Sequence, residues 1–173
     1  MTQNASSPYY LAAPYTEVTV LEVPPVATVV QAVTDSPMTS MAEVFDSTFS
    51  ALFPALGTHG LQPVGPAFSL HTRMPSDTVD MEVGLPVDRP LEEPVTAGAG
   101  ITLRPSELPA GRIAIVSHLG AYDGLGDAWG AFMQAVSEAG HQPALPFWEI
   151  YVTEPSPDQD PAAMRTDLVT LLA

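Results

Sequence analysis

An internal repeat constrains the fold of this chain more than any other feature. Residues 60–66 (GLQPVGP) match residues 140–146 (GHQPALP) at a constant offset of 80. Upstream, residues 22–24 (EVP) resemble residues 107–109 (ELP) at an offset of 85, so one short insertion or deletion separates the two copies. Repeated supersecondary units bury their apolar faces by packing on one another. The sequence therefore predicts a duplication in which two similar halves share a core.

Apolar periodicity gives the same order of elements in each half, namely strand, helix, strand, strand. In the first half we expect strands at 15–23, 26–33, 64–72 and 79–87 and a helix at 39–56. In the second half we expect strands at 111–118, 145–153 and 165–172 and a helix at 123–139. Thr39 or Ser40 is expected to cap the first helix and Asp123 the second. The predicted fold is α+β, with antiparallel sheets related by a pseudo-twofold axis and a central ligand groove.

The same pattern divides the chain into regions. Residues 1–14 are polar and contain proline, which predicts a flexible N-terminal arm. Residues 15–173 are expected to form one domain, with half one at about 15–87, a connector at 88–100 that is rich in Pro, Glu and Gly, and half two at about 101–173. No segment resembles a signal peptide or a membrane span, so the expected location is the cytoplasm.

The charge of the chain excludes some partners. Twenty acidic residues face five basic ones, all arginine, which gives a net charge of −15. Phosphate backbones and anionic lipids repel such a surface, so binding to nucleic acid or to a membrane is not expected. An acidic field would enrich cations near a cleft, although the charge also serves solubility. The sequence indicates no oligomeric state.

A glutamate between aromatic residues is the main candidate for a ligand site. In the strand predicted at 145–153, Phe147, Glu149 and Tyr151 share one face, and Trp148 lies on the other. Burying an unpaired carboxylate costs several kcal/mol. A lipophilic cation would offset that cost, and the rings would add cation–π attraction. The alternative is that Glu149 points to solvent or pairs with an arginine such as Arg112.

The offset of 80 assigns partners from the first half. It makes Ser69 the equivalent of Glu149, and it places Phe68 opposite Trp148 and His71 opposite Tyr151. His71 and Phe68 are therefore candidates to contact the ligand, although His71 is as readily a surface histidine. Tyr122, just before the second helix, is a further candidate to line the groove. Trp129 has core spacing within that helix, which favours packing.

Other site chemistries find no support. His118 has no acidic residue or second histidine at a metal-binding spacing, so no metal site is expected. The sequence contains no cysteine, phosphate loop, dinucleotide fingerprint or nucleophile elbow, so no cofactor is predicted.

Several motifs in this order resemble the GyrI-like family, which includes the effector-binding domains of multidrug-responsive activators. They are residues 65–68 (GPAF), 79–87 (VDMEVGLPV), 108–114 (LPAGRIA), 118–123 (HLGAYD) and 148–151 (WEIY). The resemblance implies a duplicated fold with a central groove, in which Glu149 meets the positive charge of the ligand. Two departures are Ala121, where the family has proline, and Ser69 in place of a second carboxylate.

The resemblance leaves two principal functions open. In the first, the protein binds bulky, hydrophobic, cationic small molecules as a sequestrant or sensor; with 14 residues before the first strand, no helix-turn-helix is expected. In the second, the protein is a hydrolase that opens the cyclopropane of DNA-alkylating natural products. Glu149 would then activate water while Tyr122 or Tyr151 polarises a carbonyl. A third and weaker alternative is inhibition of DNA gyrase by an acidic surface.

Overall fold

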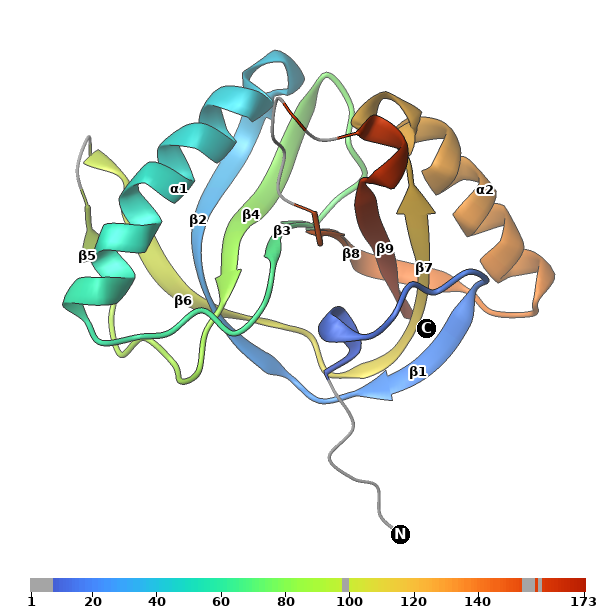
Figure 1. The fold of residues 1–173 in the computed structure, drawn as a ribbon, viewed down its shortest axis with the longest axis horizontal. Coiled ribbons are helices and arrows are strands. Elements are labelled where there is room, and N and C mark those ends of the chain that lie inside the picture. Colours follow the sequence, from blue (N-terminus) through green and yellow to red (C-terminus); the bar gives the residue numbers. More distant parts are fainter. Residues whose placement is uncertain (1–7, 98–99, 154–157, 159) are drawn as a thin grey trace, which may run out of the picture.

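The computed structural model describes residues 8–97, 100–153, 158 and 160–173. Within them, nine strands form one antiparallel sheet, and two α-helices pack on it (Figure 1). The α-helices are α1 (Met41–Thr58) and α2 (Leu125–Glu138). The strands are β1 (Thr19–Val23), β2 (Val26–Pro37), β3 (Ala67–His71), β4 (Thr78–Pro86), β5 (Val95–Thr96), β6 (Thr102–Leu108), β7 (Gly111–Leu119), β8 (Pro143–Tyr151) and β9 (Arg165–Leu172).

The strand order confirms the predicted duplication. The sheet runs β1-β7-β9-β8-β3-β4-β2-β6-β5, with β8 and β3 side by side at its centre. Outward from the centre, β8, β9, β7 and β1 on one side correspond to β3, β4, β2 and β6 on the other. The modules β2-α1-β3-β4 and β7-α2-β8-β9 are therefore related by a pseudo-twofold axis between β3 and β8. Their strands join into one continuous sheet instead of two separate ones.

Each module also pairs with a strand that belongs to the other half of the chain. Strand β1 precedes the first module but pairs with β7, with Val20 opposite Ala114. Strand β6 precedes the second module but pairs with β2, with Ala27 opposite Glu107. The segment of β6 was not among the predicted strands, because Pro105 removes a ladder donor from it. The exchange ties the two halves together through their backbones.

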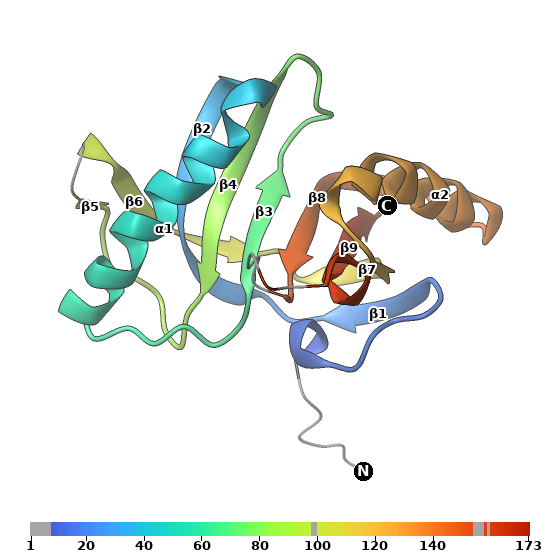
Figure 2. The same ribbon diagram turned by 45° about the horizontal axis from the view of Figure 1, so that its top comes forward.

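Both helices lie on the same side of the sheet, as the two ribbon views agree (Figures 1 and 2). Helix α1 contacts β2 and β4, and α2 contacts β7 and β8, so the central strand β3 and part of β8 lie between the helices. Ser40 is the N-cap residue of α1, as predicted, although its side chain makes no capping hydrogen bond. The predicted cap of α2 is wrong, because its N-cap residue is Gly124 and not Asp123. Short 3-10 turns precede both helices, Met38–Ser40 and Tyr122–Gly124, and the second contains Asp123.

The opposite face of the sheet is covered by the N-terminal segment. Residues 1–14 were expected to be loose, but Tyr9 and Tyr10 are 7% and 6% exposed and pack on the central strands. Arg165 fixes this segment, because its guanidinium donates hydrogen bonds to the carbonyl oxygens of Ala12 at 2.9 Å and Ala13 at 3.5 Å. Tyr9 and Tyr10 are therefore part of the core, whereas Leu11 is 51% exposed; residues 1–7 of the predicted arm lie outside the described residues. Among the described residues, no helix is long and apolar enough to cross a membrane.

Candidate functional site

Glu149 lies on one of the two central strands of the sheet. It occupies β8 directly opposite Ser69 of β3, which places the pair on the pseudo-twofold axis. Because strand side chains alternate, Ser69 and Glu149 face the side that the helices cover. Glu149 is partly buried there, and Ser69 is fully buried. The axis therefore carries one carboxylate and one hydroxyl.

Two hydrogen-bond donors hold the carboxylate of Glu149. The indole Nε1 of Trp129, on α2, donates to Oε2 at 2.6 Å, and the hydroxyl of Tyr151 donates to Oε1 at 2.6 Å. The same Tyr151 hydroxyl lies 2.8 Å from Oγ of Ser69. Burial raises the pKa of Tyr151 well above its usual value, and the charge of Glu149 raises it further, so the phenol keeps its proton. The carboxylate is thus oriented by groups from two elements.

Aromatic rings surround this hydrogen-bonded chain. Phe45 of α1 contacts Tyr151 edge-on, with ring centroids 5.5 Å apart, and Tyr122 contacts the same ring at 5.9 Å. On the α2 side, Trp129 packs edge-on against Phe147 at 4.9 Å. Burial raises the pKa of Tyr122, with a smaller effect of Glu149 in the same direction. The helices therefore contribute rings from both sides of the carboxylate.

His71 extends the set of rings along β3. It is 5% exposed, and its ring stacks on Phe147 with centroids 5.0 Å apart and planes 8° from parallel. Its Nδ1 is buried and has no hydrogen-bond partner among the described residues. Burial lowers the pKa of His71, and the nearby charge of Glu149 opposes this shift in part. His71 is therefore neutral at neutral pH. We call this set the Glu149 cluster: Glu149, Ser69, Tyr151, Trp129, Phe147, His71, Phe45 and Tyr122.

Comparison with known families assigns the chain. The model of the GyrI-like small molecule binding domain matches residues 16–170. The chain belongs to the GyrI-like family. A comparison with curated protein sequences gives no significant match.

Solved structures share the fold of this GyrI-like domain at low sequence identity. The C-terminal domain of EcmrR is 19% identical with a TM-score of 0.70, over 91% of this chain and 97% of that one. In the complex of EcmrR with DNA, the match has 19% identity and a TM-score of 0.68; it covers 90% of this chain and 57% of the EcmrR chain.

Two further structures carry names that refer to a function. A hydrolase from Listeria innocua is 12% identical with a TM-score of 0.62, over 93% of this chain and 94% of that one. SAV2435, solved bound to tetraphenylphosphonium, is 10% identical with a TM-score of 0.61, over 91% and 94%. At these identities, the likeness establishes the fold alone.

The GyrI-like fold brings together five of the seven predicted ligand-binding residues. Glu149, Tyr151, Phe147, Tyr122 and His71 belong to the cluster. The offset of 80 gave incorrect neighbours for His71 and Phe68, because an antiparallel pair about a twofold axis aligns equivalent residues only at its centre. His71 lies opposite Phe147 and not opposite Tyr151, and Phe68 lies opposite Ile150 and not opposite Trp148.

Phe68 and Trp148 lie elsewhere in the GyrI-like domain. Both point to the opposite face of the sheet, where they are 1% and 0% exposed and pack in the core beneath Tyr9 and Tyr10. The alternation of side chains along β3 and β8 places them there, and the sequence analysis had already assigned Trp148 to the other face from Glu149. We leave both residues out of the candidate site.

Three residues of the cluster were not predicted to contact a ligand: Trp129, Phe45 and Ser69, of which Ser69 had been noted only as the equivalent of Glu149. Trp129 packs on Phe132 at 5.6 Å as its spacing predicted, yet it also bonds Glu149. Spacing does not distinguish these roles. Phe45 gave no signal beyond helix periodicity. The suggested partner Arg112 instead lies 3.5 Å from Glu22 at the surface, so it does not neutralise Glu149.

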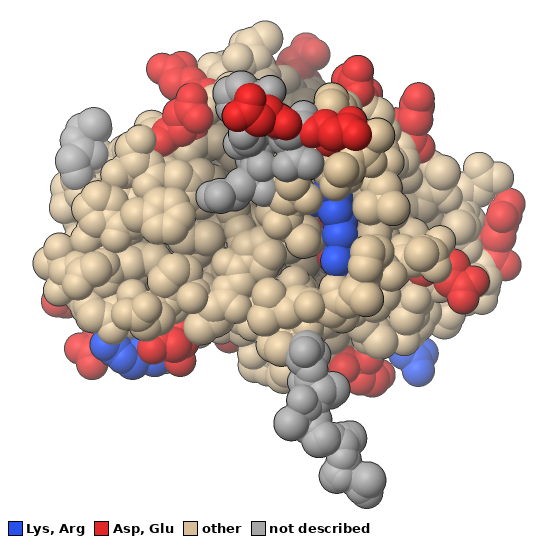
Figure 3. All heavy atoms as spheres, in the orientation of Figure 1, with Lys and Arg blue, Asp and Glu red and all other residues tan. Residues whose placement is uncertain are grey.

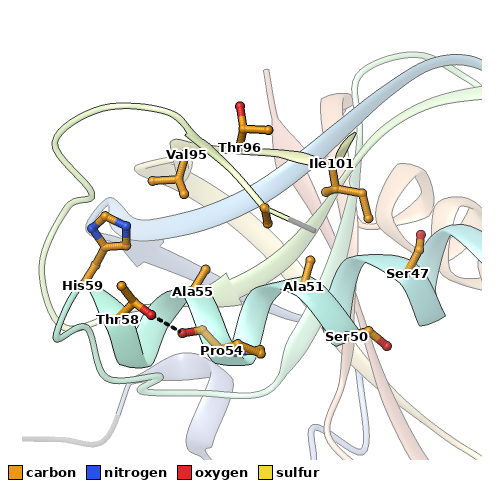
Figure 4. Close-up of a pocket in the computed structure, with 11 residues that line it drawn as sticks. Ser47, Ser50, Ala51, Pro54, Ala55, Thr58, His59, Val95, Thr96 and Ile101 are labelled. Carbon is orange, nitrogen blue, oxygen red and sulfur yellow. Dashed lines mark hydrogen bonds between the residues drawn. The ribbon is translucent and has the colours of Figure 1, made fainter. Parts of the chain in front are cut away.

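A hollow on the surface lies away from the cluster. It has a volume of about 660 Å³ and lies between the outer side of α1 and the segment around β5 (Figure 4). Its lining includes Ser47, Ala51, Ala55, Val95 and Ile101, and no residue of the Glu149 cluster. We base the candidate site on the carboxylate and its donors, because this hollow contains no comparable constellation of charge and rings.

The surface charge is consistent with a site for cations. On the face drawn in Figure 3, acidic side chains lie mainly around the outline, and the middle is mostly neutral except for one basic patch right of centre. Such a field raises the local concentration of cations at low ionic strength. Among the described residues, no group of three or more His, Asp and Glu side chains is arranged to hold a metal ion.

Proposed function

We propose that this GyrI-like domain binds bulky, hydrophobic organic cations, with Glu149 next to the positive charge. The observation that carries the proposal is the carboxylate at the centre of the sheet, fixed by Trp129 and Tyr151 and surrounded by rings. The phosphonium ion bound to SAV2435 is a ligand of this chemical class, which supports the proposal. Sequestration or sensing of several drugs in the cytoplasm, and hence drug resistance, is the role that we propose for it.

The energetics suit such a ligand. A cation about 4 Å from a carboxylate gains about 4 kcal/mol at an effective dielectric constant near 20. Partial exposure of Glu149 lowers this value through screening by water and salt. Each aromatic ring in contact with the cation adds about 0.5–2 kcal/mol. The carboxylate and the rings are thus expected to contribute to affinity in comparable amounts.

Fluorescence titration of rhodamine 6G, a cationic dye, tests the proposal. We expect the substitution Glu149→Gln to weaken rhodamine binding by about 10- to 100-fold, because it removes the charge and keeps the shape. Binding of the neutral dye Nile red should stay unchanged. Glu138→Gln is the matched control, since it removes the same charge from an exposed position on α2.

Two results would contradict the proposal. Equal weakening of both dyes by Glu149→Gln would indicate general damage to the site. Equal weakening of rhodamine by Glu138→Gln would assign the effect to the overall acidic field instead of to the cluster.

A second candidate function is hydrolysis of a cyclopropane, and the bond from Tyr151 to Glu149 favours it. In that reaction a water oxygen bonds to a cyclopropane carbon, a ring C–C bond breaks, and the conjugated carbonyl oxygen takes the proton. Tyr151 or Tyr122 would give its proton to the carbonyl oxygen, and Glu149, after accepting a proton from the water, would return one to the tyrosine. Mass spectrometry of a cyclopropane-bearing alkylator after incubation separates the functions. A water adduct that forms with the wild type and not with Glu149→Gln supports hydrolysis, and intact recovery supports binding.

A further inference from the structure

Among the described residues of the central strands β3, β4, β8 and β9, Glu149 is the only acidic one on the helix-covered side of the sheet. Paired residues of neighbouring strands share a face. Glu82 of β4 lies opposite Leu70, which packs in the core on the other side, and Asp80 shares the face of Glu82 because it lies two residues away. Asp167 of β9 also faces that core. The helix-covered side of these strands therefore carries one negative charge.

Ser69 is the counterpart of Glu149 across the pseudo-twofold axis, and it brings no charge. Its side chain is 0% exposed, and its Oγ lies 2.8 Å from the hydroxyl of Tyr151. Because Tyr151 donates its own proton to Glu149, the hydroxyl of Ser69 donates to Tyr151. The serine is thus engaged in the hydrogen-bonded chain and offers a ligand no anionic partner.

The groups of the first module around Ser69 are neutral as well. His71, two residues along β3, is 5% exposed, and burial lowers its pKa. Gln31 of β2 lies in the same row of the sheet as Ser69, and its side-chain oxygen accepts a hydrogen bond from Thr48 of α1. The acidic residues of both helices are exposed to water. A second positive charge beside Ser69 would therefore lose its water without gaining an anionic partner, which is unfavourable.

We propose that Ser69 is a specificity-determining residue that restricts this site to organic cations with a single positive charge. The charge of such a ligand lies beside Glu149, and a rigid dication of the same shape must place its second charge among neutral groups. The acidic field of the protein acts in the opposite direction, because it attracts a dication more strongly than a monocation. A preference for the monocation therefore cannot arise from the net charge of −15. This inference rests on the proposed function.

Two rigid aromatic cations of nearly the same shape test the inference. The compound 1-methyl-4-phenylpyridinium carries one positive charge, and paraquat, in which a second methylpyridinium ring replaces the phenyl ring, carries two. Their affinities for the wild type are measured by displacement of rhodamine 6G. We expect the monocation to bind about tenfold more tightly than paraquat, or better, because only one of the two charges of paraquat finds a carboxylate.

Substitution at position 69 tests whether Ser69 is responsible. Ser69→Asp and Ser69→Asn introduce side chains of the same shape that differ in charge. Relative to Ser69→Asn, Ser69→Asp should raise the affinity for paraquat over that for the monocation by about tenfold, because the second charge then has a partner. Ser137→Asp is the control, since it adds the same charge at an exposed position of α2, and it should change this ratio by less than about twofold. Circular dichroism checks that the variants fold, and the comparison of the two cations on the wild type does not depend on them.

The outcomes that overturn the inference differ from those that overturn the proposed function. If the wild type binds no organic cation, the proposed function fails, and the inference fails with it. If the wild type binds rhodamine but does not prefer the monocation to paraquat, whether it binds both or neither, only the inference fails. A folded Ser69→Asp with the same ratio of affinities as Ser69→Asn, or an equal change in Ser137→Asp, would also overturn it.

Discussion

The ion pair between Arg165 and Asp167 gives the most quantitative test of the fold. Nε and Nη2 of Arg165 each lie 2.8 Å from a different carboxylate oxygen of Asp167, which is the bidentate arrangement. The Asp167 side chain is 0% exposed and that of Arg165 is 11% exposed. Ser117 donates a further hydrogen bond to Asp167 at 2.6 Å. We expect Arg165→Met to leave a buried carboxylate with only the hydroxyl of Ser117 among the described partners.

The expected loss follows from the burial. Removing one partner of a buried ion pair destabilises a protein by about 3–5 kcal/mol. The lost hydrogen bond to Ala12 adds about 1 kcal/mol, so we expect Arg165→Met to lower the free energy of unfolding by about 5 kcal/mol. For a domain of this length, that corresponds to a fall in Tm of about 10–20 °C. The free energy of unfolding of a domain is typically about 5–15 kcal/mol, so the expected loss is about a third of it or more.

Urea denaturation of four proteins checks the reasoning: the wild type, Arg165→Met, Asp167→Leu and the double variant. The double variant should be more stable than Arg165→Met alone, because two apolar side chains replace the ions and no buried charge remains. The coupling between the two positions should therefore exceed about 1 kcal/mol. A loss below about 1 kcal/mol for Arg165→Met, or simple additivity in the double variant, would refute the argument.

Two further predictions concern single residues. Burial lowers the pKa of His71, so below about pH 6.5 the unfolded chain takes up a proton that the folded protein does not. The free energy of unfolding of the wild type should therefore decrease as the pH falls from about 6.5 toward the lower folded pKa of His71, by at most about 1.4 kcal/mol per pH unit. The variant His71→Phe should not show this contribution to the pH dependence. Unfolding free energies of both proteins between about pH 7.5 and 5.5 check this; a constant difference would contradict it. Gly84→Ala should prevent stable folding, because the added Cβ would lie 2.0 Å from the backbone oxygen of Val29. A Tm of Gly84→Ala within about 3 °C of the wild type would disprove this steric argument.

The sequence was most informative where local pattern determines structure. The repeat and the periodicity predicted both modules, since helix and strand periods are local properties. Alternation along the strand around Glu149 correctly separated Phe147 and Tyr151 from Trp148. Pairing between distant strands was less accessible. Nothing local in β6 indicates that it pairs with β2, and Pro105 lowered its strand signal.

The donors and rings around the carboxylate were only partly predictable. Core spacing placed Trp129 against the sheet but did not reveal that its indole N–H reaches Glu149. Phe45 approaches Tyr151 from the other module, and that approach depends on how α1 packs over the sheet. The cluster therefore includes contributions that exist only after the two modules have assembled.

The position of Glu149 opposite Ser69 has a consequence for the orientation of the ligand that we propose. If two identical chains formed this sheet, symmetry would require the same residue at both positions. Two glutamates there would repel each other, and two serines would carry no charge. A single covalent chain removes that requirement, so one carboxylate faces one hydroxyl across the axis. For the proposed ligand, we therefore expect one of the two reversed poses about this axis to be favoured, because only one of the two facing positions carries a charge.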